Sequence, residues 1–129
     1  MEPPRRRTWA DKFADAFRGL VRAARTQPSL AVHAAVAVAV IAAAAGCRAA
    51  AWEWAFLVMA IGLVIAAETF NTAIESLARG PGSRRHPRLR DALDISAAAV
   101  LVAAATAAVV GLIVLGPRLL GLVLAAAKT

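Results

Sequence analysis

Residues 54–78 have the sequence WAFLVMAIGLVIAAETFNTAIESLA, an apolar run that ends in a short polar motif. The run carries no charge as far as Ala67, and its helical pattern continues to Ala78. At about 1.5 Å per residue, a helix of this length is long enough to cross the roughly 30 Å hydrocarbon layer of a membrane. With the tryptophan that precedes the run, we predict a transmembrane helix over residues 52–78.

Two further apolar blocks flank this one. The first covers residues 30–47 and is interrupted only by His33, and the other covers residues 95–116. Pro117 either kinks the last helix or ends it, with a short separate helix over 119–127 in the second case. Hydrophobic residues make up 60% of the 129 positions, and the mean hydropathy of +0.66 lies well outside the range of soluble domains. The predicted fold is therefore an all-α integral membrane protein with three transmembrane helices.

Residues 1–29 form a basic N-terminal region that differs from the three-span domain over residues 30–129. Aromatic and aliphatic residues recur in it at three- and four-residue spacing, which predicts an amphipathic helix on an anionic membrane surface. The charges within the apolar stretch and the lack of a cleavage site argue against a signal peptide. Nucleic-acid binding is not expected, because most of the chain lies in lipid. The basic residues are Arg5, Arg6, Arg7, Lys12, Arg18, Arg22 and Arg25.

The remaining positive charges predict the orientation. The connection over residues 79–94 contains five arginines, whereas Arg48 is the only basic residue in the turn over 47–52. The positive-inside rule then places the N-terminus and the 79–94 loop in the cytoplasm and the C-terminus outside. The expected location is the inner (plasma) membrane.

Three polar residues interrupt the end of the second span. Glu68, Asn71 and Glu75 follow one another at spacings of three and four, so they share one helical face over about 10 Å. An ionisable residue at the bilayer centre costs roughly 2.5–3.5 kcal/mol, although these lie near the predicted cytoplasmic boundary. One interpretation is a solvated helix end whose acids are neutralised by the arginines of the next loop. It gives no reason for an asparagine on the same face.

The other interpretation is phosphoryl transfer to a lipid. One carboxylate would take the proton of a lipid hydroxyl, and another would hold the Mg²⁺ that accompanies ATP. The chain contains no GxxxxGK[ST] loop and no HRD or DFG motif, which excludes the familiar soluble kinase folds.

Four segments of the chain resemble one known family. They are FADAFRGLVRAARTQ (13–27), AETFNTAIE (67–75), HPRLRDALD (86–94) and SAAAVL (96–101), with His33 as a further match. Together they are similar to the prokaryotic diacylglycerol kinase family, which includes undecaprenol kinases, over about residues 12–115.

The resemblance implies a homotrimer of three-span subunits that uses Mg²⁺ and ATP to phosphorylate a lipid alcohol, either diacylglycerol or undecaprenol. By position, Glu68 corresponds to the family's general base and Asn71 to the neighbouring active-site asparagine. Glu75 corresponds to a glutamate that binds the metal beside the nucleotide. His86 and Asp94 correspond to residues near the nucleotide, Asp94 being the aspartate of a lysine–aspartate pair.

Several positions depart from the family pattern. Gln27 replaces a second metal-binding glutamate and is kept as a candidate metal ligand, Leu93 replaces the lysine of the pair, and Arg79 replaces an aspartate. Arg90 would restore a positive charge beside Leu93 if the third helix starts early. The alternative function is a catalytically weak or inactive member with a structural or regulatory role. Without the resemblance, Asp94 would be interpreted as the N-cap of the third span.

Overall fold

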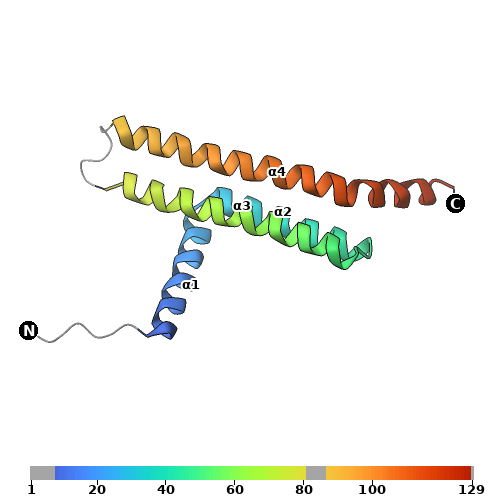
Figure 1. Ribbon diagram of the computed structural model, residues 1–129, viewed down its shortest axis with the longest axis horizontal. Coiled ribbons are helices and arrows are strands. Elements are labelled where there is room, and N and C mark those ends of the chain that lie inside the picture. Colours follow the sequence, from blue (N-terminus) through green and yellow to red (C-terminus); the bar gives the residue numbers. More distant parts are fainter. Residues whose placement is uncertain (1–7, 81–86, 129) are drawn as a thin grey trace, which may run out of the picture.

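The computed structural model describes residues 8–80 and 87–128, which fold into four α-helices with no strand among them. The three longer helices are long and apolar enough to cross a membrane, and they are preceded by a shorter N-terminal helix (Figure 1). This confirms the predicted fold class of an all-helical, multi-pass membrane protein. The helices are α1 (Trp9–Thr26), α2 (Pro28–Gly46), α3 (Ala51–Ala78) and α4 (Pro87–Ala126).

Helix α1 starts at a reciprocal cap and runs across the direction of the other three helices (Figure 1). The Thr8 hydroxyl accepts the Asp11 N–H, and the Asp11 carboxylate accepts both the hydroxyl and the N–H of Thr8. These donors hold the pKa of Asp11 below its usual range. Trp9, Phe13 and Phe17 are exposed along α1, as a helix that buries one face in a membrane surface requires.

Gln27 is the joint between α1 and α2. Its backbone is extended, with φ −118° and ψ 109°, and its N–H donates to the carbonyl of Ala23. Pro28 explains this conformation, because the proline ring disfavours helical geometry in the residue before it, while proline itself fits the first turn of a helix. The joint places Gln27 against α3, where it becomes part of the site described below.

Helices α3 and α4 pack side by side along most of the length of α3, and α2 lies against α3 (Figure 1). Their tightest packing is near the turn between α2 and α3, around Ala44, Leu57, Val114 and Leu115. Many other large apolar side chains of the three helices point outward, among them Phe56, Leu63, Leu101 and Leu112. An outward apolar surface of this kind is what a lipid environment allows and water does not.

An ion pair fastens the same end of the bundle. The Arg118 guanidinium of α4 donates from Nε and Nη2 to the two oxygens of Glu53, at 2.9 and 2.6 Å. Its Nη1 donates to the carbonyl of Cys47, the C-cap residue that follows α2, at 3.1 Å. Glu53 is only 5% exposed and also accepts the N–H of Ala50 at the start of α3. We call Glu53 and Arg118 the turn-end pair, because they lie at the end of the bundle that holds the turn between α2 and α3. Their contacts connect all three long helices.

Helix α4 is longer than the predicted third span. It begins at Pro87 and continues through Pro117 to Ala126, so residues 95–116 are its middle part. The proposed N-cap role of Asp94 is therefore wrong, because Asp94 lies two turns inside the helix, and a proline can serve as the first helical residue. Pro117 removes one helical N–H without ending the helix.

Candidate active site

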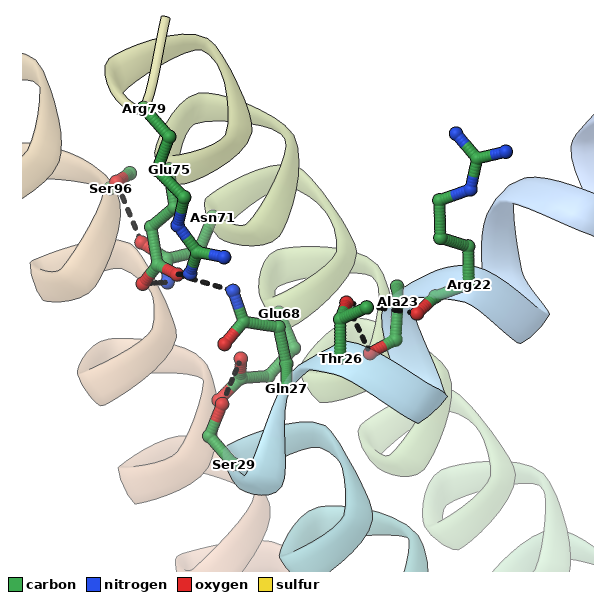
Figure 2. A network of polar contacts seen from close by, with 10 residues as sticks. All are labelled: Arg22, Ala23, Thr26, Gln27, Ser29, Glu68, Asn71, Glu75, Arg79 and Ser96. Carbon is green, nitrogen blue, oxygen red and sulfur yellow. Dashed lines mark hydrogen bonds and ion pairs between the residues drawn. The ribbon is translucent and has the colours of Figure 1, made fainter.

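Glu68 is one of the most buried polar residues in the structure, with 3% of its surface exposed. The Ser29 hydroxyl donates to its Oε2 at 3.1 Å, and Nε2 of His33 lies 3.2 Å from its Oε1 (Figure 2 shows the serine contact). Ser29 and His33 are one turn apart on α2 and face α3 together. The interpretation of a solvated helix end neutralised by arginines does not describe Glu68, because its partners are a hydroxyl and an imidazole.

Glu75, two turns further along the same face of α3, has three nitrogen donors around its carboxylate (Figure 2). Gln27 Nε2 donates to Oε2 at 2.5 Å, and Asn71 Nδ2 donates to Oε1 at 2.9 Å. Arg79, one turn onward and largely exposed, reaches Oε2 at 3.4 Å. Arg79 therefore does neutralise Glu75, so the interpretation of a solvated helix end with arginine-neutralised acids applies to Glu75 in part.

Ser96 of α4 fixes the orientation of the Asn71 amide. The Ser96 Oγ lies 2.7 Å from Asn71 Oδ1 and 2.9 Å from the carbonyl of Leu93, yet a hydroxyl has one hydrogen to donate. If the amide were reversed, its oxygen would face the Glu75 carboxylate and repel it. The hydroxyl hydrogen therefore goes to Asn71, and the Asn71 NH₂ group points at Glu75.

The structure gathers some of the predicted site residues and separates others. Gln27, Asn71 and Glu75 form one hydrogen-bonded cluster, and Glu68 lies beside it on the same helix face. Asp94 is exposed on α4, and among the described residues no hydrogen bond or ion pair joins it to this cluster. His86 lies outside the described residues.

Helix α4 starts at Pro87, so Arg90 and Leu93 both lie within it, about one turn apart. This early start was the condition under which Arg90 would replace the positive charge that Leu93 lacks. Arg90 is exposed, and Leu93 is half-buried.

Four polar residues at or beside the site were not assigned a structural role from the sequence. Ser29 and His33 are the only polar residues of α2, and their spacing of four was a usable signal. Ser96 begins the small-residue run of the family motif and was not assigned a partner. Thr72, which lies between Glu68 and Glu75 in the sequence, is buried, and its hydroxyl has no hydrogen-bond partner among the described residues.

The side chains around Glu75 do not by themselves fit a resident Mg²⁺ ion. Magnesium requires about six oxygen ligands and is normally bound through one or two carboxylates. Glu75 is the one carboxylate in the cluster, and the amides of Gln27 and Asn71 present nitrogen rather than oxygen to it. The described residues contain no group of three or more His, Cys, Asp or Glu side chains placed to hold a metal.

An apolar groove of about 590 Å³ runs between α2, α3 and α4. Its lining is almost entirely aliphatic, and His33 is its one titratable residue. Because His33 also contacts Glu68, the groove ends beside the buried carboxylate. Other lining residues are Val36, Ile61, Val64, Gly111 and Leu115.

Comparison with known proteins identifies the family of the chain. Residues 14–115 match the model of the prokaryotic diacylglycerol kinase family. The undecaprenol kinase of Bacillus subtilis (strain 168) is 34% identical over 107 residues, which cover 83% of this chain and 87% of that protein. No solved structure gives a significant match. The chain therefore belongs to the prokaryotic diacylglycerol kinase family and is a lipid kinase of the membrane.

Proposed function

We propose that the protein transfers the γ-phosphoryl group of ATP to the hydroxyl of a membrane lipid alcohol at the cytoplasmic face of the plasma membrane. In this reaction the lipid oxygen attacks the γ-phosphorus while Glu68 takes the hydroxyl proton. The bond from the γ-phosphorus to the β,γ-bridging oxygen breaks, and ADP leaves. The observation that carries the proposal is the position of Glu68, a buried carboxylate at the end of an apolar groove.

The groove suits the lipid substrate. A hydrocarbon chain that lies along the aliphatic lining brings its polar end to the level of His33 and Glu68. The Ser29 hydroxyl and the His33 imidazole hold the two oxygens of Glu68, which limits the rotamers open to the carboxylate. Positioning of this kind is the main contribution a protein makes to phosphoryl transfer.

The cluster around Glu75 suits the phosphate donor. The cluster lies between Glu68 and the C-terminal end of α3. Arg79, which follows that end, is largely exposed. ATP arrives from water as its Mg²⁺ complex, so in this proposal the metal enters as part of the substrate. We propose that Arg79 on α3 and the exposed Arg90 on α4 attract the phosphates, and that the exposed Asp94 on α4 contacts the nucleotide.

The proposed orientation follows from the basic residues of α1 and of the 79–94 connection, which belong on the cytoplasmic side under the positive-inside rule. The turn-end pair and the C-terminus then face outward.

We also propose a homotrimer, as the family resemblance implies. A second groove, between α3 and α4, is lined by Ala67, Ala98, Ala99 and Thr106 among others. Small side chains let a neighbouring helix approach closely, so this surface supports contact with a second copy of the chain.

The first experiment asks which lipid accepts the phosphate. Protein in phospholipid vesicles receives γ-labelled ATP with Mg²⁺ and either undecaprenol, diacylglycerol or no added alcohol. We expect label in a lipid monophosphate, with undecaprenol preferred because the similar Bacillus protein is named for that substrate. Label in the diacylglycerol sample alone would show that diacylglycerol, and not undecaprenol, is the substrate. ATP hydrolysis without any labelled lipid would contradict the kinase proposal.

A further inference from the structure

We infer that Gln27 keeps Glu75 metal-free in the resting protein, so that Mg²⁺ enters this site only together with the nucleotide phosphates. The inference takes the identity of the nucleotide from the proposed function. What it says about the resting site does not depend on that function. It concerns a position where the chain has an amide in place of a second carboxylate.

The hydrogen bonds show how the resting site is filled. Glu75 Oε2 accepts the Gln27 amide and, at longer distance, Arg79, while Oε1 accepts the Asn71 amide. Three of the roughly four lone pairs of the carboxylate therefore already face N–H donors, so a metal ion that binds both oxygens has to displace at least one of these donors. The Asn71 amide is further held by Ser96, so reversing it would cost a second hydrogen bond.

The charge balance favours the same conclusion. Glu75 contributes −1 and Arg79 contributes +1, so the immediate contacts of the carboxylate are neutral overall. A divalent cation bound there alone would leave a net charge of +2 beside an apolar bundle, which is unfavourable. A triphosphate brings enough negative charge to reverse this balance, together with the additional oxygen ligands that Mg²⁺ prefers.

The joint between α1 and α2 gives Gln27 a simple way to respond. Its backbone is held extended by Pro28, while the terminal torsion of its side chain is soft and nearly two-fold. Turning the amide over would present Oε1 in place of Nε2 without moving either helix. Gln27 would thus become a metal ligand when a cation and phosphates arrive, and a hydrogen-bond donor to Glu75 when they leave.

The test measures metal binding directly, with Mn²⁺ as a paramagnetic probe followed by electron paramagnetic resonance. Purified full-length protein in nanodiscs is titrated with Mn²⁺ alone and then with Mn²⁺ and a non-hydrolysable ATP analogue. Wild type is expected to bind no more Mn²⁺ than Glu75→Gln without nucleotide, and to bind one equivalent through Glu75 with the analogue. Gln27→Glu is expected to tighten nucleotide-free binding at least about 10-fold, because it supplies a second carboxylate.

Thr26→Glu is the matched control, since it adds the same charge one residue away. The Thr26 side chain bonds back to the carbonyl of Arg22 and points away from Glu75, so this variant should gain no Mn²⁺ site (Figure 2).

Tight nucleotide-free binding by wild type that disappears in Glu75→Gln would overturn the inference. So would a Gln27→Glu variant that gains no metal, or a wild type that stays metal-free with the analogue. Lipid labelling in the same samples reports separately on the proposed function. A protein that labels no lipid but shows the expected nucleotide-free pattern would contradict the kinase and leave the resting-site account intact.

Discussion

Replacing Glu68 by glutamine is expected to lower the initial rate of lipid phosphorylation by about 10²- to 10⁴-fold, the usual contribution of a general base. An amide cannot take the proton from the attacking hydroxyl. It can still accept the hydrogen bond from Ser29, so the buried site keeps a partner and the fold should persist. The measurement is label transfer from γ-labelled ATP into lipid under initial-rate conditions.

The matched control is Asp91→Asn, which removes an exposed acid from α4 near the same end of the bundle. Its rate should equal that of wild type, and the thermal unfolding of both variants should stay close to wild type. If Glu68→Gln kept more than about a tenth of the wild-type rate, Glu68 would not be the base.

Removing Arg118 is expected to cause the largest loss of stability of any single change outside the site. Arg118→Ala leaves Glu53 buried without its counter-charge and frees the Cys47 carbonyl that the guanidinium also satisfies. Breaking one partner of a buried ion pair is strongly destabilising, and we expect the unfolding temperature in detergent to fall by on the order of 10 °C. The unfolding temperature of Arg118→Lys should lie between those of wild type and Arg118→Ala. A lysine keeps the positive charge, but its ammonium cannot reproduce the bidentate contact with Glu53.

Two further variants separate the lost ion pair from general damage to α4. Lys128→Ala removes an exposed charge near the end of the chain and should leave the unfolding temperature unchanged. Adding Glu53→Gln to Arg118→Ala should recover part of the loss, since glutamine can still accept the Ala50 N–H without a buried charge. An Arg118→Ala variant as stable as wild type would contradict a stabilising role for the turn-end pair.

The membrane-spanning helices could be predicted because they depend on local composition. An apolar run of sufficient length is enough to identify a span, and the three helices over Pro28–Gly46, Ala51–Ala78 and Pro87–Ala126 overlap the three predicted segments. The shared face of Glu68, Asn71 and Glu75 was also predictable, because residue spacing within one helix determines it.

Contacts between helices were harder to predict, because they depend on packing that one helix does not specify. Glu53 and Arg118 are 65 positions apart and meet only because α3 and α4 pack together along the bundle. In the same way, the contact of His33 on α2 with Glu68 on α3 depends on how the two helices pack and not on the sequence of either helix alone. The start of α4 was misplaced because Pro87 was taken as part of a loop, although a proline is compatible with the first helical turn.

The central claim is that the buried Glu68 site phosphorylates a lipid from the membrane face that carries α1. The most direct measurement adds γ-labelled ATP, which does not cross membranes, to sealed vesicles of defined orientation prepared from cells that produce the protein. Inverted vesicles, whose cytoplasmic face is outside, should form labelled lipid monophosphate at once. Right-side-out vesicles should form none until they are permeabilised. Labelled lipid in sealed right-side-out vesicles, or none in either preparation, would contradict the account.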